Sequence, residues 1–205
     1  MTKLSSSQLD FLSHHRIPLS EVFDATGIPK KKYQALMRQA KKHIAIGVSP
    51  CAKADHTMRT RSGHCIQCNP ANIAFQLRSD ADGTIYLAGS QSEELLKIGF
   101  SKNINNREYQ INTNFYGGAN DWEMIFWIEV DQAGTIEIDI HKVMHKFSVP
   151  GTYFSNNVEI DCYELYKCNA SVARNAIKSQ VLASSCSIKL IFQAPHFKHY
   201  NFIRR

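Results

Sequence analysis

Three cysteines and one histidine stand close together in the sequence, at the spacing C-x4-H-x8-C-x2-C. They are Cys51, His56, Cys65 and Cys68. Structural zinc is held by four such ligands in a tetrahedron, and a C-x2-C pair is typical of a zinc knuckle. The segment between the two pairs is polar and has little core of its own, so metal binding would have to order it. The spacing therefore predicts a structural Zn²⁺ site.

Two alternatives to this zinc site remain, one for its histidine ligand and one for the site as a whole. His64 could replace His56, but adjacent residues such as His64 and Cys65 rarely bind one metal well, and we favour His56. The alternative to zinc is a set of ordinary thiols with surface histidines. The remaining cysteines lack ligand spacing and are expected to be buried or free thiols: Cys162, Cys168 and Cys186.

Length and hydropathy limit where the chain can act. It has 205 residues, of which 43% are hydrophobic, enough for a packed core. No apolar run approaches the roughly 20 residues that a membrane-spanning helix needs, and the first residues lack the apolar stretch of a signal peptide. We therefore expect a cytoplasmic protein with no membrane partner, in a reducing compartment where disulfides are rare.

Charge is unevenly distributed along the chain. The net charge is +6, but residues 1–80 carry 12 Lys+Arg against 5 Asp+Glu, a net +7, whereas residues 81–205 carry 12 against 13, a net −1. A basic first part joined to a near-neutral second part suggests a nucleic-acid-binding arm attached to something else. Lysine-rich helices that are merely solvated are the alternative.

Residues 7–47 are predicted to be helical. The pattern indicates helices over 7–14 and 21–25, a turn at Gly27, and a basic helix from Pro29 towards Gly47. This order resembles a helix-turn-helix DNA reader, although an ordinary three-helix unit is also compatible with it. Six basic residues of this helix and of the metal-bound loop are candidate phosphate contacts: Lys30, Lys31, Lys32, Arg38, Arg59 and Arg61.

The second half carries strand signals. Strands are expected at 84–89, 95–100, 124–130 and 162–167, a late strand or extended segment at 187–192, and helices at 103–112, 134–147 and 171–184. This pattern predicts an α+β fold with a small mixed or antiparallel central sheet flanked by helices. We divide the chain into a helical DNA-binding region (1–48), a zinc-binding loop (49–75) and a third domain (80–205).

An ordered set of motifs within the third domain supports a family resemblance. Ten residues separate Thr84-Ile85-Tyr86 from Lys97-Ile98-Gly99, and Arg107 and Glu137 follow. This set resembles the GIY-YIG nuclease superfamily, which includes excision-repair incision enzymes, phage homing endonucleases and restriction endonucleases. It is most similar to the subgroup with KIG in place of YIG and an E-x3-H helix, here Glu137 and His141.

The resemblance implies a role for each residue. Tyr86 would be the general base for the attacking water, a role that needs a nearby positive charge or metal at neutral pH. Lys97 would help to activate that base or hold phosphate, and Arg107 would stabilise charge on the attacked phosphate. Glu137 would hold one divalent ion, Mg²⁺ or Mn²⁺. His141 would orient water or phosphate, or it is simply a packed helix-face histidine.

Some positions depart from the family pattern or have no assigned role. Thr84 replaces the first glycine, Lys97 replaces a tyrosine, and the late asparagine of the family is not assigned, although Asn156 and Asn157 lie in the right region. Tyr116 could line the site beside Tyr86, or it belongs to a structural turn followed by a buried tryptophan.

The resemblance and the charge together favour a metal-dependent DNA endonuclease, with restriction or defence against foreign DNA as one biological setting. Its partner would be double-stranded DNA, and because one site cuts one strand at a time, a double-strand break would need a homodimer or two binding events. Two alternatives remain: a DNA-binding regulator or adaptor with an inactive nuclease fold, and an RNA- or structure-specific nuclease.

Overall fold

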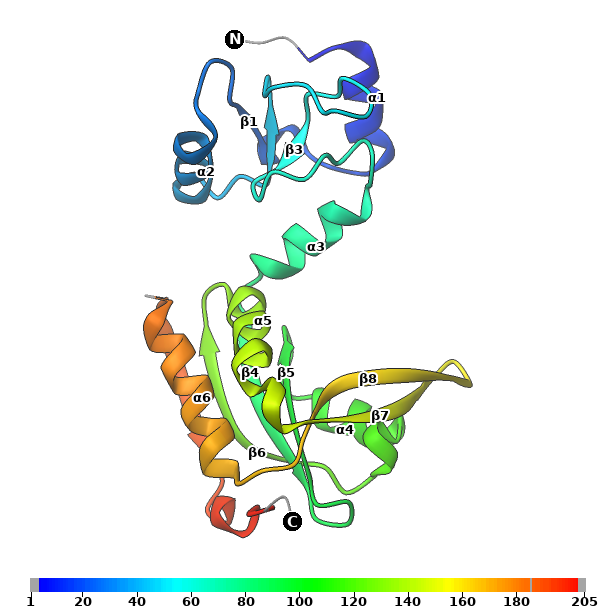
Figure 1. Cartoon of the computed structure of the whole chain (residues 1–205), viewed down its shortest axis with the longest axis vertical. Helices are drawn as coiled ribbons and strands as arrows, with labels where there is room; N and C mark the ends of the chain where they lie inside the picture. The colour runs from blue at the N-terminus through cyan, green and yellow to red at the C-terminus, as the bar shows by residue number, and fades with distance from the viewer. Residues whose placement is uncertain (1–3, 185, 203–205) are drawn as a thin grey trace. The chain divides into compact units, whose positions relative to one another are not determined.

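The computed structural model describes residues 4–184 and 186–202, and the chain divides into two compact units between Arg78 and Ser79 (Figure 1). No helix in the described ranges is long and apolar enough to cross a membrane.

The N-terminal unit contains a small sheet of order β1-β2-β3, in which β1 runs parallel and β3 antiparallel to β2. Its elements are α1 (Ser6–His14), the 3₁₀ turn η1 (Leu19–Glu21), β1 (Val22–Asp24), α2 (Lys30–Gln39), β2 (Ile44–Ile46), β3 (Arg59–Thr60) and α3 (Ala71–Ser79), which ends at the boundary. The central strand β2 is buried along its whole length. Ile44 and Ile46 pack into one apolar cluster with Leu12, and Ala45 packs into another with Tyr33 and Met37.

The helix predicted over 21–25 is wrong. Leu19–Glu21 form a 3₁₀ turn, and Val22–Asp24 pair with β2 as a strand. The basic helix also ends at Gln39 rather than continuing towards Gly47, because the apolar residues Ile44–Ile46 form the buried central strand. A strand therefore separates α1 from α2 where the sequence suggested consecutive short helices.

The C-terminal unit is built on a sheet of order β7-β8-β5-β4-β6-β9 in which every pair of neighbouring strands is antiparallel. Its strands are β4 (Gly83–Ser90), β5 (Leu95–Ser101), β6 (Glu123–Val130), β7 (Ser148–Ser155), β8 (Val158–Tyr166) and β9 (Ile188–Gln193). Its helices are α4 (Arg107–Thr113), α5 (Ala133–Met144) and α6 (Ala170–Ala183), with 3₁₀ turns η2 (Tyr116–Gly118), η3 (His145–Phe147) and η4 (Phe197–His199). The α+β prediction is confirmed.

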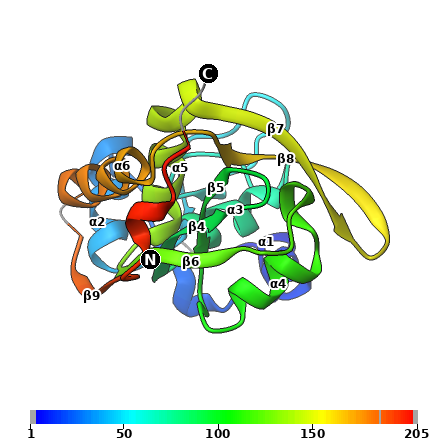
Figure 2. The same ribbon diagram turned by 90° about the horizontal axis from the view of Figure 1, so that it is seen from below.

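The two faces of this sheet bury different clusters. Residues that alternate along a strand point to opposite faces. Ile85 and Leu87 of β4 accordingly pack with α5 and α6, whereas Tyr86 and Ala88 belong to the cluster of α4 and η2. Helices α5 and α6 lie side by side in both views (Figures 1 and 2).

The β7–β8 hairpin projects beyond the rest of this unit in both views. Only two residue pairs join β8 to β5, Leu96 with Tyr166 and Lys97 with Leu165. Asn156 and Asn157 form the turn at the tip with φ values of 51° and 60°. Asparagine tolerates this left-handed conformation better than most residues, so both asparagines have a structural role here.

Candidate functional sites

Tyr86 and Arg107 are joined by a hydrogen bond. Tyr86 lies in β4 and is fully buried, and Arg107 is the first residue of α4. Arg107 Nε donates to the Tyr86 hydroxyl at 2.9 Å. Burial by itself would lower the pKa of Arg107, but Tyr86 and nearby Glu164 favour the charged form and raise that pKa. Arg107 therefore stays cationic beside the Tyr86 hydroxyl.

Gly99 makes this position of Tyr86 possible. It lies opposite Tyr86 in the β4–β5 pair, and the tyrosine ring crosses over it. A Cβ atom at Gly99 would lie 2.4 Å from the Tyr86 hydroxyl oxygen and 2.6 Å from Cζ, which is closer than real contacts allow. The glycine of the Lys-Ile-Gly motif thus leaves room for the tyrosine of the Thr-Ile-Tyr motif.

Lys97 forms a buried ion pair with Glu164 on the same side of the sheet as Tyr116. Its Nζ atom lies 2.5 Å from Glu164 Oε2 and 3.8 Å from the centre of the Tyr116 ring. The Tyr116 hydroxyl donates to the same Oε2 atom at 3.1 Å. Burial first, and then the charge of Glu164, raise the pKa of Tyr116 far above its usual range, so its hydroxyl keeps the proton that it donates.

Glu164 stays ionised despite its partial burial. Burial by itself would raise the pKa of Glu164, but the attraction of Lys97 outweighs it and holds that pKa below the usual value. The sequence patterns assigned no role to this residue. The available signal was its position two residues after Cys162, which is buried, in the predicted strand. Alternate residues of a strand share a face.

Glu137 and His141 lie one turn apart on α5. Glu137 is 2% exposed, and its Oε1 atom lies 3.8 Å from His141 Nε2. The other ring nitrogen of His141, Nδ1, is hydrogen-bonded to the Tyr166 hydroxyl. One oxygen of Glu164 lies within 4.8 Å of both a Glu137 oxygen and a His141 nitrogen. Glu164 therefore connects the Lys97–Tyr116 contact to the pair on α5.

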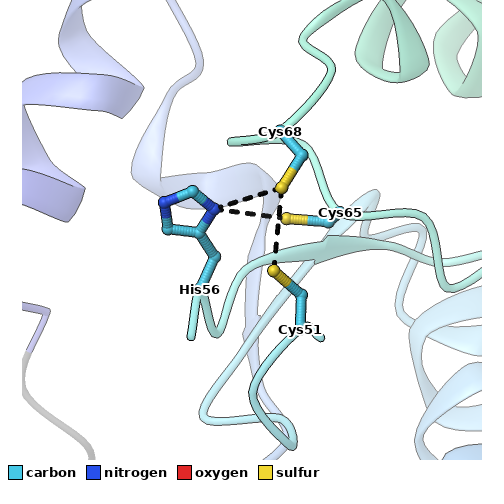
Figure 3. Close-up of side chains that lie close together, drawn as sticks. All are labelled: Cys51, His56, Cys65 and Cys68. Atoms are coloured by element: carbon cyan, nitrogen blue, oxygen red, sulfur yellow. Dashed lines mark hydrogen bonds between the residues drawn. The ribbon is translucent and has the colours of Figure 1, made fainter. Parts of the chain in front are cut away.

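The structure gathers the four residues predicted to bind zinc. Figure 3 shows the three thiols and the imidazole of His56 pointing towards one another. Cys51 Sγ lies 3.6 Å from Cys68 Sγ, and His56 Nδ1 lies 3.7 Å from Cys65 Sγ and 3.4 Å from Cys68 Sγ. His64 is exposed and is not part of the group.

These separations fit a tetrahedral ion. Ligands at the usual Zn–S and Zn–N distances stand about 3.5–3.8 Å apart along the edges of the tetrahedron. A turn brings the first two ligands together, since the backbone N–H of Cys51 donates to His56 O at 2.9 Å. Burial opposes ionisation of Cys51, but hydrogen bonds from the backbone of Ala54 and His56 outweigh it and lower its pKa to about 6. The cluster can therefore hold a structural metal.

The six candidate phosphate contacts all lie in the N-terminal unit. Lys30, Lys31 and Lys32 are exposed on the first turn of α2, and Arg38 is exposed on its last turn. Arg59 is half-buried on β3 and donates from Nη2 to Ser49 O at 3.0 Å.

Two of these six residues share a cavity. Lys30 and Arg59 both line a hollow of about 550 Å³, together with Gly27 and Tyr33. Arg61 follows β3, and its carbonyl accepts a hydrogen bond from Gln34 Nε2 at 2.8 Å.

Most of the other cysteines, and the tryptophan that follows η2, are buried. All six cysteines are free thiols, and Cys162 and Cys168 are buried. Trp122 is buried, and its Nε1 donates to Tyr116 O at 2.8 Å. Tyr116 therefore belongs to a structural turn, and its hydroxyl also reaches the Lys97–Glu164 pair.

One family model matches part of the chain. Residues 83–180 match the T5orf172 domain, a nuclease-associated domain family. The matched segment runs from β4 into α6 and contains Tyr86, Lys97, Arg107, Glu137 and His141. No curated protein and no solved structure matched the chain.

Proposed function

We propose that the chain is a metal-dependent DNA endonuclease that hydrolyses phosphodiester bonds at a GIY-YIG-type site in residues 80–205. The observation that carries this proposal is the hydrogen bond from Arg107 to the Tyr86 hydroxyl. It provides the cation that a tyrosine base needs, and the same cation could contact a phosphate. The match of residues 83–180 to a nuclease-associated domain supports the same conclusion.

In this mechanism deprotonated Tyr86 takes a proton from a water molecule. The water oxygen attacks phosphorus, and the bond from phosphorus to the 3′ oxygen breaks. The leaving 3′ oxygen takes a proton from solvent water, which gives 5′-phosphate and 3′-hydroxyl ends. Arg107 stabilises first the tyrosinate and then the charge that develops on the phosphate. Lys97 keeps Glu164 in place through their ion pair.

Glu137 would hold a divalent ion beside this site. The fit is good, because Glu137 is buried within reach of a histidine and a second carboxylate. When bound, Mg²⁺ or Mn²⁺ would supply stabilisation of the negative charge on the leaving 3′ oxygen.

The N-terminal unit would grip DNA. The net positive charge of the chain lies there, since residues 1–80 carry a net +7 and residues 81–205 a net −1. Exposed lysines of α2 together with Arg59 can contact phosphates. Zinc at the Cys3His cluster would fix the loop that leads into β3. A double-strand break would need either a second copy of the chain, which supplies a second site, or two successive binding events.

Plasmid nicking with and without Mg²⁺ or Mn²⁺ tests the proposal. The wild type should nick supercoiled DNA only with a divalent ion. Tyr86→Phe and Glu137→Gln should each lower the rate by about 10²-fold or more, the usual effect of removing a catalytic group. Tyr109→Phe is the matched control, because Tyr109 is on α4 but 74% exposed, and it should keep the wild-type rate.

Each alternative function gives a different result. Salt-sensitive binding to duplex DNA without nicking in any divalent ion would indicate an inactive adaptor. Faster cutting of RNA or single strands than of duplex would indicate an RNA- or structure-specific nuclease. Equal nicking by the wild type and Glu137→Gln would refute the assignment of the metal ligand.

A further inference from the structure

The two ring nitrogens of His141 have different surroundings. Nδ1 is hydrogen-bonded to the Tyr166 hydroxyl. Nε2 is buried, has no hydrogen-bond partner among the described residues, and lies 3.8 Å from Glu137 Oε1. Leaving a buried polar nitrogen unsatisfied costs about 1–3 kcal/mol, so such an atom calls for an explanation.

A metal ion would explain this atom. Histidines that bind metals commonly donate from the second ring nitrogen to a neighbouring oxygen, which fixes the ring and leaves the other lone pair for the metal. Tyr166 is placed to accept from Nδ1 in this way.

Glu164 supplies a second carboxylate. Its ligand atom and those of Glu137 and His141 all lie within 4.8 Å of one another. Lys97 and Tyr116 both contact Oε2 of Glu164, and neither of these contacts involves Oε1. Three groups from α5 and β8, far apart in sequence, therefore converge on one point.

We propose that Glu137, His141 and Glu164 together form a divalent-cation site that prefers Mn²⁺ to Mg²⁺ and Ca²⁺. One imidazole ligand sets this preference, because nitrogen ligands suit transition metals whereas Mg²⁺ and Ca²⁺ favour oxygen. The inference rests on the proposed function only for the use of the ion in DNA cleavage, because binding itself needs no DNA.

Mn²⁺ binding to the DNA-free, zinc-loaded chain tests this site. Continuous-wave EPR measures the concentration of free Mn²⁺ and so gives the affinity of the protein for this ion. Electron spin-echo EPR shows whether a nitrogen atom is bound to the ion. The wild type should bind one Mn²⁺ in addition to its zinc, with a nitrogen modulation that changes on ¹⁵N-histidine labelling. Mg²⁺ should displace Mn²⁺ only at about 10-fold or greater excess.

Variants identify the ligand. His141→Gln should abolish the nitrogen modulation and weaken Mn²⁺ binding by about 10-fold or more, and Tyr166→Phe should weaken it by a similar factor. His145→Gln and Glu159→Gln, which change exposed residues, should leave binding unchanged. Wild-type protein that binds no Mn²⁺, or binds it without nitrogen modulation, would overturn the proposal without the need for a variant.

Parallel nicking assays separate this inference from the proposed function. Nitrogen-coupled Mn²⁺ without nicking would support the metal site and refute the endonuclease. Metal-dependent nicking without nitrogen coupling would support the endonuclease and overturn the assignment of His141 as a ligand.

Discussion

Lys97 Nζ lies 2.5 Å from Glu164 Oε2, and this ion pair joins β5 to β8 where only two residue pairs connect the strands. Lys97 has no exposed side-chain surface, whereas Glu164 is 32% exposed. Glu164 is the only acidic residue within ion-pair distance of Lys97 in the part of the chain that the structure describes. The ion pair therefore stabilises the fold and also holds Glu164 in its position.

Removing one charge should destabilise the protein more than removing both. Glu164→Gln leaves buried Lys97 uncompensated and should lower the free energy of unfolding by about 3 kcal/mol, near the low end for buried pairs because Glu164 is partly exposed. Lys97→Met combined with Glu164→Gln should recover most of this stability. Urea denaturation measures the free energy of unfolding of both variants. A double variant no more stable than Glu164→Gln would contradict the explanation.

The Lys97–Glu164 pair should also make the stability of the protein depend on pH. The folded-state pKa of Glu164 lies below its ordinary value of 4.5, so its contribution is full above 4.5 and is lost as the pH falls through the lowered value. Urea denaturation from about pH 6 to about pH 3 should therefore show a steeper loss for the wild type than for the Lys97→Met, Glu164→Gln double variant. Parallel curves would show that other carboxylates dominate.

Gly99 should be essential for activity even though it carries no reactive group. In Gly99→Ala the new methyl group collides with the Tyr86 ring, which must move away from Arg107. We expect nicking to fall about as far as in Tyr86→Phe, by about 10²-fold or more, with a lower melting temperature because the ring is buried. Full activity in a folded Gly99→Ala variant would show that this position of Tyr86 is not required.

Zinc should stabilise the N-terminal unit. Elemental analysis should find one zinc per chain, and Co²⁺ substitution should give the absorption of a tetrahedral thiolate site. Cys65→Ser should lose the metal and expose the loop before β3 to protease. Cys186→Ser removes a cysteine from outside the cluster and should change neither result. Full metal content in Cys65→Ser would exclude Cys65 as a ligand.

Much of the C-terminal sheet was predictable because its signals are local. The strands at 84–89 and 95–100 were predicted from two short apolar segments joined by a polar turn, and β4 and β5 confirm them. Strand β7 was missed because it contains Pro150 and Gly151, residues that usually argue against a strand.

The features that could not be predicted depend on contacts between residues far apart in the sequence. Val22–Asp24 became a strand because β2 lies alongside it, and pairing of this kind overrides weak helix preference. Glu164 lies 67 residues from Lys97 in the sequence, so nothing local indicates their contact. The same holds for its approach to Glu137 and His141, which follows from the path of β8 past α5.

DNA binding should depend on basic residues of the N-terminal unit. Arg59 shares a cavity with Lys30, and removing one phosphate-binding side chain should reduce the slope of log K against log salt concentration by about 0.9. Arg59→Ala should therefore weaken binding about equally for all duplex sequences and give a shallower slope. Lys198→Ala, an exposed change in the C-terminal unit, should alter neither quantity. Fluorescence anisotropy with labelled duplexes at several salt concentrations measures both, and an unchanged slope in Arg59→Ala would place the phosphate-binding residues elsewhere.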